Sequence, residues 1–125
     1  MMTEQRPTLK GIMNRLEGVE LRDRHGRKFY YPLRLTKQMR ETPLEALELS
    51  VRSFNCLKRA GYSTVGELVD SISEGKELRS IRNCGARSVR EIMEQLFLFQ
   101  YASLKTEKRD AYLAEVVRMN LEKQE

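Results

Sequence analysis

The 125-residue sequence predicts a mainly α-helical protein, and three observations support this prediction. Apolar residues recur in successive segments at the three- and four-residue spacing that places them on one helix face. Capping residues begin these segments, and glycines follow two of them. The stretch Thr106–Lys123 keeps the same spacing near the C-terminus. We therefore expect a compact four-helix domain over residues 44–101, preceded by an extension over residues 1–43 and followed by a helical extension over residues 102–125.

The N-terminal extension is predicted to hold a helix, a β-hairpin and a linker. Thr8–Glu17 has the periodicity of an amphipathic helix. Val19–Arg22 and Phe29–Leu35 alternate between apolar and polar residues on either side of Asp23–Gly26, which is typical of a hairpin. Lys37–Pro43 is polar and ends in a proline, so we expect a linker that leads into the main domain.

Four short helices are expected in the main domain. Ser50 is a suitable N-cap for the first and Gly61 a suitable stop. Thr64 and Glu67 have the spacing of a capping box at the start of the second. The expected ranges are Val51–Ala60, Val65–Ser71, a short segment that begins at Ser73 or Glu74 and carries Leu78, and Ala86–Phe99.

Two of these helices place basic and small polar residues at their N-termini. In the first, Val51, Phe54 and Leu57 form the expected buried stripe, which leaves the side chains of Arg52, Asn55 and Cys56 off that stripe. In the fourth, the turn Asn83–Gly85 precedes a first turn made of Ala86, Arg87 and Ser88. A helix N-terminus offers unpaired N–H groups and partial positive charge, so two such ends brought together would bind phosphate.

The C-terminal extension is predicted to be one helix, Thr106–Lys123. Its apolar stripe contains Asn120, which suggests that this face is not deeply buried. The remaining members of the stripe are Leu113, Val116, Val117 and Leu121. Packing back on the domain, binding a partner, and fraying stay open as alternatives for this helix.

The net charge of +5 is unevenly distributed along the sequence. Residues 1–43 hold ten Lys/Arg and five Asp/Glu, whereas residues 44–104 hold eight of each. The basic residues of this neutral domain concentrate in Arg52–Arg59 and Arg79–Arg90. A local basic face of this size predicts modest, salt-sensitive phosphate binding, and ordinary solvated helix charges are the alternative.

The sequence gives no support for an enzyme or a cofactor. His25 is the only histidine and lies in the predicted turn, so no catalytic triad can be formed. The two cysteines, Cys56 and Cys84, lack zinc-site spacing and are expected to be reduced thiols, with a disulfide or redox switch as the alternative. No glycine-rich phosphate loop, membrane-spanning apolar run or signal peptide is recognisable, so we expect a cytoplasmic protein without a small-molecule substrate or a membrane partner.

The run Leu47–Gly61 (Leu-Glu-Leu-Ser-Val-Arg-Ser-Phe-Asn-Cys-Leu-Lys-Arg-Ala-Gly) closely resembles the C-terminal domain of the bacterial RNA polymerase alpha subunit. The resemblance extends from about Pro43 to Phe97. The later run Arg82–Ser88 is a looser match, which by itself would indicate only a helix-hairpin-helix turn. The resemblance implies a helix-hairpin-helix-like fold that binds the minor groove of A·T-rich double-stranded DNA near the nucleoid and has no polymerase activity.

The resemblance also implies a set of site residues. The DNA surface would consist of the residues Arg52, Asn55, Cys56, Lys58, Asn83, Gly85, Arg87 and Ser88. Ala86 stands where the family usually has a further basic residue. Glu45 and Glu48 match residues that contact sigma factor, whereas Ala46 replaces a common acidic residue. Other faces of the family domain receive transcription activators.

The 43 residues before the resemblance match no part of an alpha N-terminal assembly domain. We therefore expect a stand-alone alpha C-terminal-domain-like protein that takes part in transcription. Two alternatives stay open: a protein–protein adaptor that acts through the hairpin and the C-terminal helix, and a generic helix-hairpin-helix DNA-binding protein.

Overall fold

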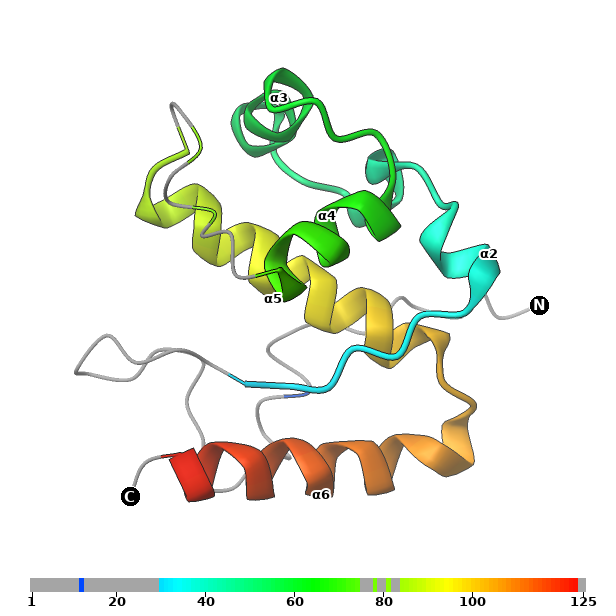
Figure 1. Cartoon of the computed structure of the whole chain (residues 1–125). Helices are drawn as coiled ribbons and strands as arrows, with labels where there is room; N and C mark the ends of the chain where they lie inside the picture. The colour runs from blue at the N-terminus through cyan, green and yellow to red at the C-terminus, as the bar shows by residue number, and fades with distance from the viewer. Residues whose placement is uncertain (1–11, 13–29, 75–77, 79–80, 82–83, 124–125) are drawn as a thin grey trace. The chain divides into compact units, whose positions relative to one another are not determined.

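A computed structural model of the protein describes residues 12, 30–74, 78, 81 and 84–123. The protein forms two compact units, which we call the central unit (Arg34–Leu96) and the flanking unit (Met1–Leu33 with Phe97–Glu125). The elements in order are α2 (Lys37–Arg40), the 3-10 turn η1 (Leu44–Leu47), α3 (Val51–Arg59), α4 (Val65–Ser73), α5 (Ala86–Ser103) and α6 (Thr106–Lys123) (Figure 1).

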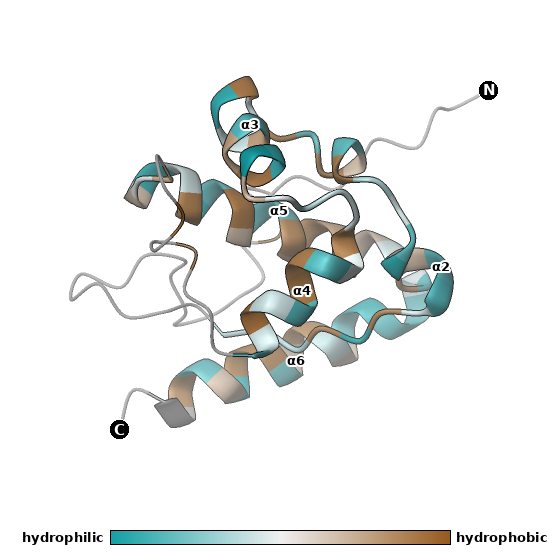
Figure 2. Ribbon diagram, turned by 45° about the horizontal axis from the view of Figure 1, so that its top comes forward, coloured by the Kyte–Doolittle hydropathy of each residue, from teal (hydrophilic) through white to brown (hydrophobic). Residues whose placement is uncertain are grey.

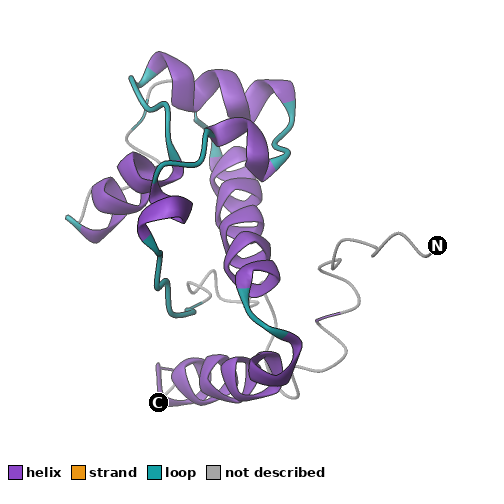
Figure 3. Cartoon of the chain, turned by 90° about the vertical axis from the view of Figure 1, so that its right-hand side faces the viewer, coloured by secondary structure: helices purple, strands orange, loops and turns teal. Residues whose placement is uncertain are grey.

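The mainly helical prediction is confirmed, but the β-hairpin is not observed. Figure 3 shows helices and loops throughout the described residues, without a strand. Residues 30–35, the described part of the second predicted arm, are not a strand. The first arm, the turn with His25, and the predicted helix Thr8–Glu17 apart from Ile12 lie outside the described residues.

The limits of α3 follow from its caps, as the sequence predicted. The Ser50 hydroxyl accepts a hydrogen bond from the Ser53 N–H at 3.3 Å. At the other end, the N–H groups of Gly61 and Tyr62 donate to the carbonyls of Lys58 and Leu57, the paired bonds of a Schellman motif. Gly61 adopts a φ of 95°, a left-handed conformation that favours glycine.

Helix α4 begins with the predicted capping box. The Thr64 hydroxyl accepts from the Glu67 N–H, and the Glu67 carboxylate accepts from the Thr64 N–H. Figure 2 shows that apolar and polar residues alternate along the α4 ribbon. Val65 and Leu68 are fully buried, as expected from the spacing.

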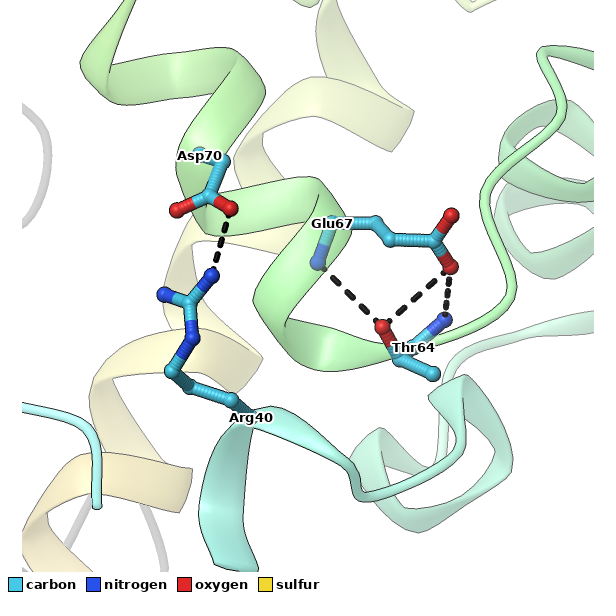
Figure 4. A network of polar contacts seen from close by, with 4 residues as sticks. All are labelled: Arg40, Thr64, Glu67 and Asp70. Carbon is cyan, nitrogen blue, oxygen red and sulfur yellow. Dashed lines mark hydrogen bonds and ion pairs between the residues drawn. The ribbon is translucent and has the colours of Figure 1, made fainter. Parts of the chain in front are cut away.

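The segment Lys37–Pro43 is not the linker that we expected. It contains α2, whose last residue packs directly on α4 at Gly66. The Val65 N–H donates to the Thr42 carbonyl at 2.9 Å, and Arg40 pairs with Asp70 (Figure 4). The polar composition therefore reflects a short surface helix that is held in place by contacts from α4.

Helix α5 extends beyond the predicted end at Phe99 to Ser103. Arg109 from α6 donates hydrogen bonds to the carbonyls of Ala102 and Leu104, which stabilises the end of α5. The predicted short third helix lies mostly outside the described residues, although Leu78 is buried in the core. The fully buried apolar residues of the central unit are Leu44, Leu47, Leu57, Val65, Leu68, Ile92 and Leu96.

In the flanking unit, α6 contacts Tyr30 and Pro32 of the N-terminal extension, and the prediction for Asn120 is wrong. Asn120 is only 5% exposed. Its Oδ1 accepts from the Tyr30 N–H at 2.9 Å, and its Nδ2 donates to the Tyr30 carbonyl at 2.6 Å. The Asn120 amide thus pairs with both backbone groups of Tyr30, as a neighbouring β-strand would. Asn120 can therefore be buried with its polar atoms hydrogen-bonded.

An aromatic cluster surrounds Phe97 in the flanking unit. The Phe97 ring packs edge-on against Tyr31 at 5.4 Å and is stacked with Tyr112 at 6.2 Å between centroids. The Tyr112 hydroxyl donates to the Pro32 carbonyl at 2.8 Å. Burial raises the pKa of Tyr31 well above its ordinary value, and the nearby Tyr112 raises it further. These contacts hold Tyr31 and Pro32 beside α6.

The close approach of α2 to α4 predicts that Gly66→Ala destabilises the central unit. A Cβ at position 66 would lie 2.8 Å from the Arg40 carbonyl oxygen and 2.9 Å from its Cβ, so the backbone must shift. We expect a loss of about 1–3 kcal/mol in unfolding free energy, measured by urea denaturation. Gly85→Ala is the control, because a Cβ there meets nothing within 4 Å. Equal stability of both variants and wild type would contradict this packing.

The two hydrogen bonds between Asn120 and the Tyr30 backbone predict that Asn120→Leu is destabilising, although leucine is more hydrophobic than asparagine. The substitution leaves the N–H and carbonyl of Tyr30 without these partners. We expect a loss of about 2–3 kcal/mol in thermal or urea unfolding. Leu121→Ala, at a 45% exposed neighbour, is the control and should change stability by less than about 0.5 kcal/mol. If Asn120→Leu were more stable than wild type, the hydrogen bonds from Asn120 to Tyr30 would make no net contribution to stability.

Candidate nucleic-acid interface

The exposed side of α3 carries two of the predicted DNA-binding side chains close together. Arg52 and Asn55 are both exposed and lie about one helical turn apart. No carboxylate among the described residues pairs with Arg52. This part of α3 therefore offers a guanidinium and an amide to an external ligand.

The buried side of α3 differs from the predicted stripe. It consists of Ser53, Cys56 and Leu57, whereas Val51 is 76% exposed. Cys56, which was expected on the DNA surface, is only 2% exposed and faces the core. The physical reason is that the hydroxyl of the buried Ser53 finds a half-buried hydrogen-bond partner, which sequence periodicity does not reveal.

That partner is Glu91 of α5, a residue that the sequence analysis did not select. Its carboxylate accepts hydrogen bonds from the Ser50 N–H at 2.7 Å, the Ser50 hydroxyl at 2.8 Å and the Ser53 hydroxyl at 2.5 Å. The N-terminus of α3 is thus occupied by an anion of the protein itself. The expectation that both helix N-termini would bind phosphate is therefore wrong for α3.

The start of α5 remains accessible. Gly85, Ala86 and Arg87 are exposed, and the first turn of any α-helix carries N–H groups without a partner in the helix itself. The Ser88 side chain is only 5% exposed, so its hydroxyl is unavailable at the surface, although its backbone N–H belongs to the first turn. Asn83 lies outside the described residues.

Lys58 is exposed but turned toward other groups of the central unit. Its Nζ lies 5.9 Å from the centroid of the Phe54 ring, within cation–π range. Hydrogen bonds from the N–H groups of Ser63 and Thr64 lower the pKa of Glu67, and the charge of Lys58 lowers it further. Lys58 is therefore engaged by an aromatic ring of its own helix.

Cys56 and Cys84 are free, buried thiols. Burial raises the pKa of Cys84 to about 12, and a hydrogen bond with Cys56 contributes to this rise. The two cysteines are thus neighbours in the core below the exposed residues of α3 and α5. At neutral pH the Cys84 thiol is protonated, which makes it a poor nucleophile.

The two acidic candidates precede α3. Glu45 and Glu48 are both exposed, and Glu48 adopts a left-handed conformation with a φ of 54° at the end of η1. Such a conformation is uncommon for a residue with a side chain. It turns the backbone between η1 and the Ser50 cap of α3.

A second polar cluster, between α2 and α4, has a structural explanation (Figure 4). Arg40 donates to Asp70, which lowers the pKa of Asp70, and Thr64 and Glu67 complete the capping box. In the described ranges, no group of three or more His, Cys, Asp or Glu side chains is arranged to hold a metal ion. None of the described helices is long and apolar enough to span a bilayer.

The Glu91 network predicts a pH-dependent contribution to stability. Burial raises the pKa of Glu91, but the hydrogen bonds from Ser53 and Ser50 outweigh burial and lower it overall. The stabilisation is therefore complete at neutral pH and is lost as the pH falls through this lowered pKa. We expect Glu91→Gln to cost about 1 kcal/mol at pH 7 and progressively less below pH 4, measured by urea denaturation.

Glu107→Gln, at an exposed position on α6, is the control for loss of one carboxylate. It should leave both the stability at pH 7 and its pH dependence close to wild type. If Glu91→Gln loses the same free energy at every pH, the charge of Glu91 has no part in holding α3 to α5.

Comparison with known proteins places the central unit in a family. Residues 34–97 match the family model that describes the C-terminal domain of the alpha subunit of bacterial RNA polymerase. The DNA-directed RNA polymerase subunit alpha of Cutibacterium acnes is 58% identical over 55 residues, which is 44% of this protein and 16% of that subunit. The subunit of Rubrobacter xylanophilus is 51% identical over 61 residues, or 49% of this protein and 19% of the relative.

The similarity is confined to one domain of these relatives. The subunit of Carboxydothermus hydrogenoformans is 45% identical over 60 residues, 48% of this protein and 18% of its own length. The protein thus spans less than a fifth of the curated relatives it matches. No solved structure matches the sequence. Because the family match covers half of the sequence and includes α2 to most of α5, the protein belongs to the family of C-terminal domains of bacterial RNA polymerase alpha subunits.

Proposed function

We propose that this protein is a DNA-binding module of bacterial transcription that inserts α3 side chains into the minor groove of A·T-rich DNA. The observation that carries the proposal is the exposure of Arg52 and Asn55 about one turn apart on α3. The Glu91 hydrogen bonds fix this helix against the start of α5. A guanidinium and an amide are thus presented on a rigid support.

The chemistry of these groups suits a minor groove better than a major groove. Arginine is attracted to a narrow minor groove, where the negative potential is strongest over A·T-rich sequence. The Asn55 amide can donate to the adenine and thymine acceptors that line the groove floor. Arg87 and the N–H groups of the first turn of α5 would then hold the phosphate backbone.

The acidic residues before α3 support a further protein contact. Glu45 and Glu48 are exposed and precede the DNA-binding helix directly. A basic surface of sigma factor bound beside the same DNA could pair with these carboxylates, and a transcription activator could occupy another face. Contacts with sigma factor and with an activator would place the protein at promoters in the nucleoid.

A second candidate function, that of a protein adaptor, is favoured by the flanking unit. This unit lies almost entirely outside the family match, yet α6 makes specific contacts with Tyr30 and Pro32. Its role would be to bind another protein while the central unit keeps the family fold. Absence of DNA binding would make this the leading function.

The test is fluorescence anisotropy on A·T-rich and G·C-rich duplexes at two salt concentrations. We expect wild type to prefer the A·T-rich duplex and to bind it more weakly at high salt. Arg52→Ala should lose more affinity than Arg87→Ala, because Arg52 enters the groove and Arg87 mainly meets phosphate. Circular dichroism should show both variants folded.

Three results would argue against the proposal. Binding to neither duplex at low salt would remove the DNA function. Equal affinity for the two duplexes would remove the minor-groove preference. Equal losses in Arg52→Ala and Arg87→Ala, with equal changes in salt dependence, would contradict the separate roles of these two arginines.

A further inference from the structure

Helix α3 carries two more basic residues, Lys58 and Arg59, and the structure distinguishes between them. Both are exposed, and both lie in the last turn of the helix. They differ in their direction around the helix axis and in the groups that surround them. The resemblance to the family selects Lys58 as a DNA contact, whereas the geometry of α3 favours Arg59.

Helical geometry aligns Arg59 with Arg52. At about 100° per residue, a separation of seven residues returns to within about 20° of the starting direction. Arg52 and Arg59 therefore lie on one line along α3, with Asn55 within about 60° of both. Lys58 is turned about 120° away from Arg52, toward the side that faces Phe54 and Glu67.

The two cations also differ in how far they are already engaged. The Lys58 ammonium lies 5.9 Å from the centroid of the Phe54 ring, so it is already engaged in a cation–π contact within the central unit. Among the described residues, Arg59 has no hydrogen bond, ion pair or ring contact. By contrast, the Arg40 guanidinium forms an ion pair with Asp70. The Arg109 guanidinium lies over the Tyr101 ring and donates hydrogen bonds to two backbone carbonyls.

We propose that Arg59, rather than Lys58, is the second basic residue of α3 in the DNA interface and contacts a phosphate at the edge of the groove. The inference rests on the proposed function. Arg59 lies about 10 Å farther along the helix axis than Arg52. Where α3 crosses the minor groove, this spacing exceeds the groove width of about 6 Å, so Arg52 can enter the groove while Arg59 reaches the backbone at its edge.

The experiment compares Arg59→Ala, Lys58→Ala and Arg118→Ala on the A·T-rich duplex over a range of salt concentrations. Arg118 is an exposed basic residue on α6, so its removal changes the net charge equally without touching α3. We expect Arg59→Ala to lose about three- to tenfold in affinity and to reduce the salt slope by about 0.9, the value for one phosphate contact. Arg59→Lys should retain most of the slope, because it keeps the charge.

Lys58→Ala should lose less affinity than Arg59→Ala, and Arg118→Ala should stay within about twofold of wild type. Melting by circular dichroism should show that every variant is folded. If Arg59→Ala matches Arg118→Ala while wild type and Arg52→Ala behave as proposed, the assignment of Arg59 is wrong and the DNA function stands. A larger loss in Lys58→Ala also overturns the assignment, and failure of wild type to bind overturns it together with the function.

Discussion

The hydrogen bonds between the Glu91 carboxylate and the start of α3 determine how the candidate interface is built. One carboxylate accepts from Ser50 twice and from Ser53 once, across about forty residues of sequence. It places a negative charge at the positive end of the α3 dipole, where it is stabilising. It also helps to fix the rotation of α3, because it accepts the hydrogen bond of the Ser53 hydroxyl on the side of the helix that faces the core.

The rotation of α3 decides which side chains face solvent. With Ser53, Cys56 and Leu57 inside, the line from Arg52 through Asn55 toward Arg59 is outside. The same contact removes the N-terminus of α3 as a phosphate site and leaves that of α5 available. The proposed DNA surface, with arginines on α3 and the first turn of α5, depends on this arrangement.

Polar contacts across long sequence separations have a similar role elsewhere. Asp70 holds Arg40, so a segment with linker-like composition becomes part of the central unit. Asn120 holds both backbone groups of Tyr30 in the flanking unit. The Arg40–Asp70 pair is exposed, so its contribution is small. Asn120 is buried, and the cost of burying its amide is offset because both of its polar atoms are paired.

The local features of this protein could be predicted from its sequence. Ser50, Gly61, Thr64 and Glu67 specify helix ends because caps depend on neighbouring residues only, and the apolar spacing identified α3 to α6. The resemblance carried by the run through Arg52 also came from sequence and is confirmed by the family match. Only the folded structure shows that Cys56 and Asn120 are buried, that α2 is no linker, and that Glu91 caps α3. Periodicity describes one helix at a time, whereas these outcomes depend on partners that folding brings together from distant parts of the sequence.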